Sequence, residues 1–368
     1  KMKKIAILGI GNAQVDVLRL LNESRNYEVH ALSYSNDGRG LDYVDHFSLI
    51  DITDKEKVKN YCAEHEIEII YSVGSDVAMP TVAYVSEELD LPHFVSYETA
   101  VSCNNKNVFR EKLKHCFGSV PFTVMEDEDT QVDLPFPLIV KPVDSQGQRG
   151  VSTAHNFQEL KASFAKAITY SKSGKVITEK KIEGEEISVN AYVINGELKF
   201  FLPSGRVSWD MFDGGIIHKH LLPSSLTTQA IENVRKLVKE TTKALEINNG
   251  PVYFQIKMEQ DAPYLIEVTP RLDGCHMWRL ISLACGVNLL DLAIQHLIGA
   301  DINIPESWPV DDMCLEFFCQ PPKEQFSLPL DHDSYIYKEL YYKVGDRVKE
   351  MNGKMEKCGY CIFPLNEA

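Results

Sequence analysis

The first 100 residues alternate apolar strand-like runs with amphipathic helical segments, and this alternation restricts the fold more than any other feature. Ile5–Leu8 form a continuous apolar run, which is followed by a glycine turn and by apolar residues at helical spacing from Val15 onward. Residues 54–65 and 68–73 repeat the helix and the strand. Strands joined by helices run parallel in one sheet, so we predict a Rossmann-like α/β domain over residues 1–100.

The glycine turn after the first run carries part of a dinucleotide-binding motif. Gly9 and Gly11 match its first two glycines, but Gln14 stands where the third glycine would allow close packing of helix and strand. The turn is consistent with an anion site at a helix N-terminus or with a plain structural turn. A nicotinamide-dependent oxidoreductase is therefore one alternative function, and it rests on this turn alone.

Beyond residue 100 the pattern becomes that of an α+β protein. The Asn195-Gly196 pair joins two alternating runs as an antiparallel hairpin, and a long helix at about 228–245 precedes a second hairpin. We expect three further parts: a small subdomain, 101–175; a larger subdomain, 176–300; and a small β-rich C-terminal cap, 301–368.

Composition excludes several classes of protein. The net charge is −15 and no block of Lys or Arg occurs, which argues against a nucleic-acid partner or an anionic membrane surface. Apolar runs are far shorter than the roughly 20 residues that cross a bilayer, so we expect a cytoplasmic protein without a membrane partner. Nine cysteines at irregular spacing indicate reduced thiols, and the pair Cys358 and Cys361 lacks the two further ligands of a zinc site.

The second hairpin places polar side chains opposite one another. Side chains alternate along a strand, so Ile266 and Val268 are expected to face away from Glu267 on the return strand. With the turn centred on Asp261, Gln255 lies directly across from Glu267, and the two side chains are about 5 Å apart. An amide oxygen and a carboxylate at this distance suit a hard cation such as Mg²⁺, although an exposed polar face is the simpler alternative.

A lysine ends an otherwise apolar strand in the stretch LIVKPVDSQGQRG. Burying an unpaired ammonium costs several kcal/mol, so Lys141 needs either a nearby carboxylate or a bound phosphate as its partner. Gly147 and Gly150 in the following loop let the backbone approach a ligand closely, and Arg149 adds a fixed cation. This composition favours a lid over a polyphosphate.

The charged segment VITEKKIEGEEISV follows a little further along the chain. Backbone groups at Lys180 and Ile182 are suited to hydrogen-bond an adenine edge, and the carboxylate of Glu186 is suited to bind a ribose. An ordinary charged loop is the commoner structure for such a segment.

Taken in order, these residues resemble the ATP-grasp superfamily. The resemblance rests on Lys106, Lys141 with the loop 145–150, the segment 179–186 and the run YLIEVTPRLDG. It covers about residues 1–300, in which the Rossmann-like domain precedes a two-subdomain ATP-grasp fold. The chain is most similar to the short single-chain relatives of the carbamoyl phosphate synthetase large chain and to the amino-acid ligases.

The resemblance implies a role for each of these residues. ATP phosphates would be held by Lys106 and Lys141 and covered by a lid that includes Ser145, Gln146, Gly147, Arg149 and Gly150. Adenine and ribose would be bound by Glu179, Lys180, Ile182 and Glu186, and Mg²⁺ or Mn²⁺ by Gln255, Glu267 and Thr269. Arg271, together with Lys141, would stabilise the phosphoryl group in transfer. The superfamily usually has an acid at 255, where the carbamoyl phosphate synthetase branch has Gln, and an Asn at 269, where this chain has Thr.

The implied function is an ATP-dependent ligase that joins a small carboxylate to an amine or ammonia through an acyl phosphate. Arg206, His218 and His276 are candidates for the acceptor pocket, where the arginine would bind the carboxylate and the histidines would receive the amine's proton. A homodimer is common among the relatives that the chain resembles. The alternative function is a non-catalytic or regulatory ATP-binding module in which Thr269 marks a degraded metal site.

Overall fold

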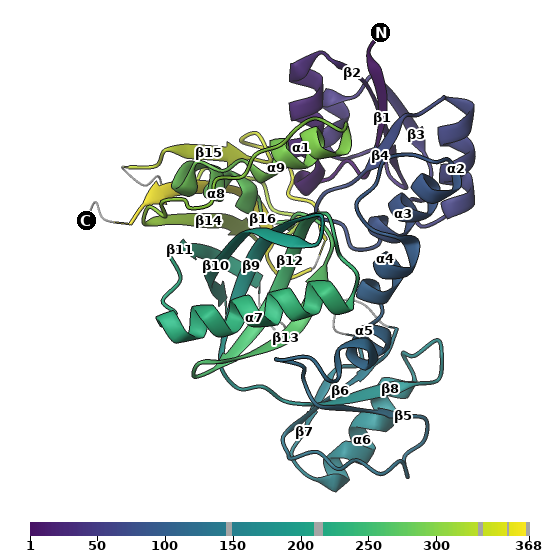
Figure 1. Cartoon of the computed structure of the whole chain (residues 1–368), viewed down its shortest axis with the longest axis vertical. Helices are drawn as coiled ribbons and strands as arrows, with labels where there is room; N and C mark the ends of the chain where they lie inside the picture. Colours follow the sequence, from purple (N-terminus) through teal and green to yellow (C-terminus); the bar gives the residue numbers. More distant parts are fainter. Residues whose placement is uncertain (145–148, 210–215, 330–333, 352, 366–368) are drawn as a thin grey trace.

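Three β-sheets organise the chain, which the computed structural model describes over residues 1–144, 149–209, 216–329, 334–351 and 353–365 (Figure 1). The first sheet is parallel and has the strand order β3-β2-β1-β4. This domain contains β1 (Lys3–Leu8), α1 (Asn12–Ser24), β2 (Tyr27–Ser33), the 3₁₀ helix η1 (Arg39–Tyr43), β3 (His46–Leu49), α2 (Lys55–Glu64), β4 (Ile69–Tyr71) and α3 (Ala78–Glu88). The α/β domain predicted from the alternation is therefore confirmed.

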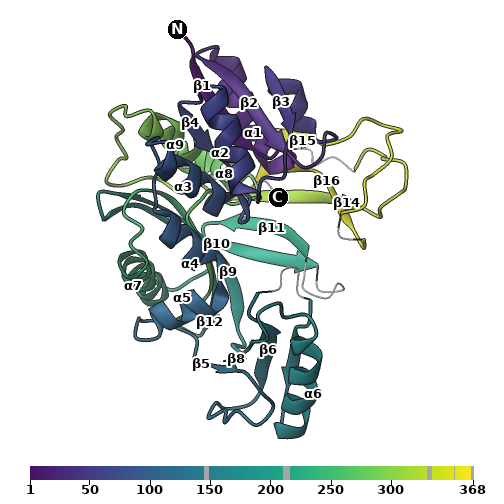
Figure 2. The same ribbon diagram turned by 90° about the vertical axis from the view of Figure 1, so that its right-hand side faces the viewer.

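A small antiparallel sheet of order β5-β8-β6-β7 forms the second unit, and α6 packs on it. Its elements are β5 (Phe122–Met125), β6 (Leu138–Pro142), β7 (Ser152–Ala154), α6 (Phe157–Ile168) and β8 (Val176–Lys180). Because β8 pairs with both β5 and β6, this subdomain extends to Lys180, beyond the boundary expected at residue 175. Figure 2 shows this unit at the end of the molecule opposite the parallel sheet, with α4 (Tyr97–Asn104) and α5 (Lys106–Leu113) between them.

An eight-stranded sheet forms the third unit, in the order β13-β12-β9-β10-β11-β14-β16-β15. Its strands are β9 (Glu185–Ile194), β10 (Glu197–Trp209), β11 (Ile216–Leu222), β12 (Gly250–Glu259), β13 (Ala262–Thr269), β14 (Met313–Gln320), β15 (Tyr337–Leu340) and β16 (Glu356–Pro364). Strand β14 pairs with β11, so the predicted β-rich C-terminal part continues this sheet and does not stand apart as a cap. The helices of this unit are α7 (Thr228–Ala244), α8 (Met277–Cys285) and α9 (Leu289–Leu297).

The two faces of the eight-stranded sheet differ in character. On one face, Leu237 of α7 belongs to the same apolar cluster as Phe254 and Ile256 of β12. On the other face, Tyr192 and Phe200 belong to the apolar cluster that includes α8 and α9. Polar side chains on β9, β10 and β12, among them Glu186, Arg206 and Gln255, contact one another on the polar part of the sheet, and the candidate site is built beside them.

No single helix in the described ranges is long and apolar enough to cross a membrane, and α8 and α9 pass the same test only as a pair bent by 107°.

Candidate nucleotide- and metal-binding site

A cavity of about 530 Å³ lies where α5, strand β13 and loops of the other units meet. Its lining residues are Asp76, Pro80, Val101, Cys103, Asn104, Asn105, Lys106, Phe109, Val143, Asp144, Glu267, Val268 and Thr269. The N-terminal domain, the helix pair α4 and α5, the end of β6 and the hairpin strand β13 therefore all contribute to one cavity.

Lys106 and Glu267 face each other in this cavity. Lys106 begins α5, directly after Asn105, whose side chain accepts a hydrogen bond from the Val108 N–H and fixes the start of the helix. The Lys106 Nζ lies 3.6 Å from the Glu267 Oε1, and both side chains are partly exposed. The structure thus brings together an ammonium and a carboxylate from separate subdomains, although residues 106 and 267 are 161 positions apart in the sequence.

Lys141 lies one residue before the end of β6, next to the cavity, and has a buried carboxylate as its partner. Its Nζ lies 3.0 Å from the Glu179 Oε1 across the β6-β8 pair. Burial lowers the pKa of the Lys141 ammonium, Glu179 raises it, and the positive charges of Lys106 and Arg110 lower it further. Lys141 and Lys106 are therefore close enough to repel each other, and an anionic ligand between them would relieve this repulsion.

Arg110 completes the buried ion network, and its role was not predicted from the sequence. It lies one helical turn after Lys106 on α5 and is only 1% exposed. Its Nε lies 3.2 Å from the Glu179 Oε1. Burial raises the pKa of the Glu179 carboxyl, but the charges of Arg110 and Lys141 outweigh that effect and hold the pKa at about 2. Glu179 is therefore ionised at neutral pH, and its carboxylate is occupied by two cations.

The β12-β13 hairpin has the predicted pair at its centre, because Gln255 lies opposite Glu267. A β-bulge follows: Ile256 pairs with Leu265, which leaves Ile266 as an extra residue in β13. Leu265 and Val268 are consequently both buried at 1% exposure, so the predicted placement of Ile266 on the Val268 face is wrong.

The bulge also explains where Arg110 donates its remaining hydrogen bonds. Its Nη1 donates to the Leu265 carbonyl at 2.5 Å, and its Nη2 donates to the Ile266 carbonyl at 3.4 Å. Arg110 thereby fixes α5 and β8 to the bulged strand that carries Glu267.

The oxygen atoms around Glu267 fit a hard divalent cation. The Gln255 Nε2 donates to Glu186, which leaves the amide oxygen of Gln255 as an acceptor. The Thr269 side chain is 8% exposed, and its Oγ1 has no hydrogen-bond partner among the described residues. A carboxylate, an amide oxygen and an unpaired hydroxyl on adjacent strands form an oxygen-only donor set of the kind that Mg²⁺ binds.

The segment expected to bind adenine and ribose is partly occupied by internal contacts. The Lys180 N–H donates to the Pro121 carbonyl at 2.9 Å, and the Ile182 side chain is buried. The Glu186 carboxylate accepts from Gln255 and lies 3.2 Å from the Arg206 Nε. Glu186 therefore already has two polar partners on the polar face of the sheet.

Part of the expected lid can be located. Ser145, Gln146 and Gly147 lie outside the described residues. Arg149 is exposed, and Gly150 has a φ of +74°, a conformation that favours glycine.

Arg271 joins the hairpin to the N-terminal domain. Its Nε and Nη2 donate to the Asp76 Oδ1 at 2.9 and 2.5 Å, and its Nη1 donates to the Leu272 carbonyl. Asp76 follows β4 and lines the cavity. The arginine expected to stabilise the phosphoryl group is thus held at the cavity by a carboxylate that the sequence analysis did not single out.

The three acceptor candidates lie in different surroundings. Arg206 lies in the polar face, where its Nη1 donates to the Tyr253 hydroxyl at 3.1 Å. Burial lowers the pKa of the Arg206 guanidinium, but its interactions with Tyr253 and Glu186 raise it, and the pKa is raised overall. His218 stacks on Trp209 with ring centroids 3.9 Å apart, and it is not among the residues that line the described cavity.

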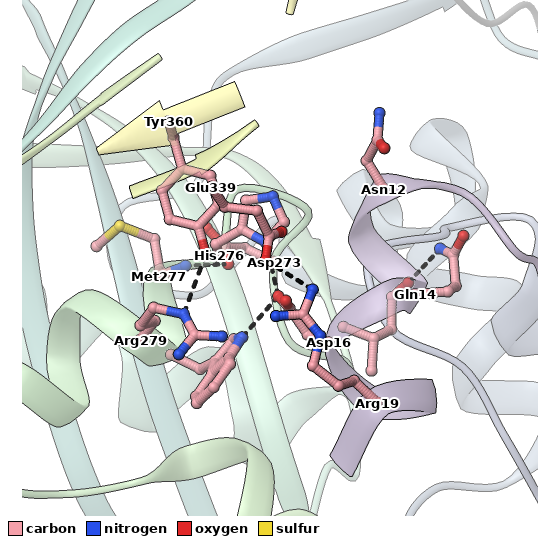
Figure 3. A network of polar contacts seen from close by, with 12 residues as sticks. Asn12, Gln14, Asp16, Arg19, Asp273, His276, Met277, Arg279, Glu339 and Tyr360 are labelled. Atoms are coloured by element: carbon pink, nitrogen blue, oxygen red, sulfur yellow. Dashed lines mark hydrogen bonds and ion pairs between the residues drawn. The ribbon is translucent and has the colours of Figure 1, made fainter. Parts of the chain in front are cut away.

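His276 belongs to a buried network that joins the N-terminal domain to the C-terminal strands (Figure 3). Its Nδ1 lies 2.6 Å from the Asp16 Oδ2 of α1, and its Nε2 lies 2.5 Å from the Tyr341 hydroxyl. The neighbouring ion pair between Arg19 and Glu339 links the same units. The structure therefore does not bring His276 together with the cavity residues.

The glycine turn of the N-terminal domain is filled by Gln14. The Gln14 Oε1 accepts from the Gly11 N–H at 2.9 Å, and its Nε2 donates to the Val73 carbonyl at 2.6 Å. A backbone donor that a dinucleotide phosphate would use is thus already bound, which argues against the oxidoreductase alternative. A second cavity of about 640 Å³ lies beside this turn and includes Arg39 and Lys349 in its lining.

Comparison with known proteins identifies the domain that carries this site. Residues 134–278 match the ATP-grasp domain family. This range includes β6, the small sheet's later elements and the whole β12-β13 hairpin. The predicted resemblance to the ATP-grasp superfamily is thereby confirmed.

Two relatives of known sequence are ligases or synthases. The carbamoyl phosphate synthase large chain of Caldanaerobacter subterraneus subsp. tengcongensis is 27% identical over 50% of this chain and 17% of its own length. The D-alanine–D-alanine ligase of Solibacter usitatus is 30% identical over 50% of this chain and 60% of its own length. The chain thus spans about a fifth or less of the large chains that it matches.

A solved structure matches nearly the whole chain. Phosphoribosylglycinamide synthetase from Anaerococcus prevotii superposes with a TM-score of 0.82 over 99% of this chain and 94% of its own, at 19% sequence identity. At this identity the similarity concerns the fold alone, and it includes the C-terminal strands β14 to β16.

Proposed function

We propose that this protein is an ATP-dependent ligase that activates a small carboxylate as an acyl phosphate and joins it to an amine or to ammonia. The single observation that carries the proposal is the cavity in which Lys106 and Glu267 lie 3.6 Å apart beside Lys141 and the oxygen donor Thr269. Cations and oxygen ligands converging on one space are what a bound Mg²⁺ and triphosphate need. The ATP-grasp domain match supports the same proposal.

The proposed reaction has two steps, and both balance without a protein nucleophile. A carboxylate oxygen of the acid attacks the γ-phosphorus of ATP, and ADP leaves. The amine nitrogen then attacks the acyl carbon, phosphate leaves, and the amine's proton passes to a base or to water. Gln255, Glu267 and Thr269 would hold Mg²⁺, and the bound ion would neutralise charge on the phosphates.

The chain's own residues contribute alignment and positive charge. Lys106 and Lys141 bind phosphate oxygens, and Arg271, which Asp76 holds at the cavity, stabilises charge on the group in transfer. Arg206, on the polar face beside Gln255 and Glu186, binds the carboxylate of the acid. The small carboxylate, the amine or ammonia and a second copy of the chain are the proposed partners.

Acid-dependent release of ADP tests this function. Wild-type protein is assayed with MgATP and a panel of small acids and amines, and at least one pair is expected to stimulate ADP release. Lys141→Met should lower kcat/KM by about 100-fold or more, because it removes a charge that the transition state needs. Lys175→Met is the matched control, since Lys175 pairs with Glu126 at the surface of the same subdomain. The proposal fails if no acid stimulates ADP release at any Mg²⁺ concentration.

A non-catalytic ATP-binding module is the second candidate function, and Thr269 is the observation that favours it. A threonine side chain is shorter than the asparagine that is usual at this position, so its hydroxyl reaches less far. This weakens the binding of a second metal ion. Calorimetric titration separates the two functions: tight MgATP binding without turnover under any acid supports the module, whereas binding with acid-dependent turnover supports the ligase.

A further inference from the structure

Three side chains with metal-binding atoms converge outside the proposed ATP site. His220 lies on β11, and Asp273 and Cys275 lie on the loop between β13 and α8. One ring nitrogen, one carboxylate oxygen and the thiol sulfur all lie within 4.8 Å of one another. Figure 3 shows Asp273 close to Met277 and His276, at the start of α8.

The polar atoms of this cluster are buried without partners. His220 is 0% exposed, and both of its ring nitrogens lack a hydrogen-bond partner within the described part of the chain. Asp273 is 4% exposed, and its Oδ2 likewise has none there. A buried polar atom left unpaired costs about 1–3 kcal/mol. Unpaired atoms on two residues whose ligand atoms lie within 4.8 Å of each other and of the Cys275 thiol therefore indicate a missing ligand.

The loop that carries two of these side chains is held in place. The Gly74 N–H donates to the Leu272 carbonyl at 3.2 Å, and the Met277 N–H donates to the Asp273 Oδ1 at 3.3 Å. The second of these bonds uses Oδ1 of Asp273 and leaves Oδ2 without a hydrogen-bond partner among the described residues. Gly274, between Asp273 and Cys275, is exposed, so the cluster lies next to the protein surface.

We propose that His220, Asp273 and Cys275 bind a thiophilic divalent metal ion, with Zn²⁺ as the expected occupant. Nitrogen, oxygen and sulfur ligands are those that Zn²⁺ takes, at bond lengths of roughly 2.0–2.3 Å. Ligand atoms on a tetrahedral ion of that size are roughly 3.3–3.8 Å apart, so the cluster closes by at most about 1.5 Å. The three protein ligands leave the fourth position for water or a bound molecule.

The charge state of the cluster is compatible with this occupant. The His220 ring is fully buried and both of its nitrogens lack a hydrogen-bond partner among the described residues, so a lone pair is available to a metal. Burial raises the pKa of the Cys275 thiol, while Lys357, whose Nζ lies 3.8 Å from the sulfur, lowers it. Metal binding then displaces the thiol proton, and two ligand charges balance the charge of the ion.

The metal site adjoins the proposed acceptor region but is distinct from the Mg²⁺ donors. His220 is the cross-strand partner of Arg206 in the β10-β11 pair. Gln255 and Glu267, in contrast, lie on β12 and β13, which β9 and β10 separate from β11 in the sheet. A thiolate ligand favours a soft ion, whereas the oxygen-only set of Gln255, Glu267 and Thr269 favours a hard one.

Cobalt titration tests the site, because Co²⁺ bound to a thiolate has a charge-transfer absorption that Co²⁺ on oxygen ligands lacks. The full chain, dialysed against chelator and then metal-free buffer, is titrated with CoCl₂. We expect a thiolate band that saturates at one equivalent and is displaced by Zn²⁺. Cys275→Ser should abolish the band, and His220→Gln should weaken Co²⁺ binding at least about 10-fold. Circular dichroism shows whether each variant is folded.

Two controls separate this site from other thiols and from the proposed function. Cys116→Ser removes a partly buried thiol outside the cluster and should leave the band unchanged. Glu267→Gln removes a ligand of the ATP-linked metal and should also leave the band unchanged, even where it abolishes MgATP turnover. Absence of the band in the wild-type chain, or its persistence in folded Cys275→Ser, overturns the proposal.

Discussion

Replacing Glu179 with glutamine should lower the free energy of unfolding by an amount that can be worked out from the structure. Glu179 neutralises Arg110 and Lys141 at once, and all three side chains are buried. Glutamine keeps the shape of the side chain but removes its charge. The guanidinium of Arg110 and the ammonium of Lys141 then lie buried without a counterion, which strongly destabilises the folded state.

The magnitude follows from the pKa of Glu179, which is lowered from 4.5 to about 2 in the folded chain. A difference of roughly 2.5 units at about 1.36 kcal/mol each gives about 3 kcal/mol of folding stability. Since the folded pKa lies below the unfolded one, this stabilisation is complete above about pH 4.5. It is lost as the pH falls towards 2.

Urea unfolding of wild-type protein and Glu179→Gln, followed by circular dichroism from pH 7 down to pH 3, measures this contribution. At pH 7 the variant should be less stable by about 3 kcal/mol. The difference should shrink as the pH falls below about 4.5, because protonation removes the same charge from the wild type. Glu126→Gln, which removes an exposed partner of Lys175, should change stability by less than about 0.5 kcal/mol. A Glu179→Gln variant as stable as wild type at pH 7, or a difference that does not depend on pH, refutes the reasoning.

Three other substitutions have defined outcomes. Thr269→Asn should lower the Mg²⁺ concentration for half-maximal turnover by roughly 3- to 10-fold, because an amide oxygen reaches further into the metal site; an unchanged Mg²⁺ dependence contradicts the ligand role. Gln14→Ala should cost about 2 kcal/mol in urea unfolding through two lost hydrogen bonds, and a loss below about 0.5 kcal/mol contradicts it. His276→Gln should lower the thermal midpoint while leaving the KM of acid and ATP unchanged; a raised KM at unchanged stability would place His276 in the acceptor pocket.

The parts of the fold with strong periodic patterns were predictable from the sequence. Gln255 and Glu267 pair as predicted, but for a reason that the sequence did not give. The turn lies between Gln260 and Asp261, because Glu259 pairs with Ala262, and the extra residue Ile266 shifts the register by one. The bulge at Ile266 was not predictable, because its cause lies in another segment: the freed carbonyls accept hydrogen bonds from Arg110. Strand β3 (His46–Leu49) was also not predicted, since a short edge strand with exposed ends lacks a clear apolar pattern.

The candidate site was predictable only where a residue's local surroundings are unusual. Lys141 was recognisable because an apolar strand precedes it. Of the two partners that the sequence allowed, a carboxylate or a phosphate, the structure shows the carboxylate of Glu179. Arg110 sits in a helix with several other charged residues, so one sequence cannot distinguish it from a solvated side chain. The proximity of His220 and Cys275 could not be predicted from the sequence, because only the fold brings β11 and the loop after β13 together.

The account depends most on the claim that a triphosphate and Mg²⁺ bind between Lys106, Lys141 and Glu267. A crystal structure of the protein with Mg²⁺ and a non-hydrolysable ATP analogue measures this directly. The expected result is β- and γ-phosphate density within hydrogen-bonding distance of both ammonium groups, with the metal on the Glu267 carboxylate. Nucleotide density beside the Gly9–Gly11 turn, with the cavity at Lys106 empty, would contradict the account.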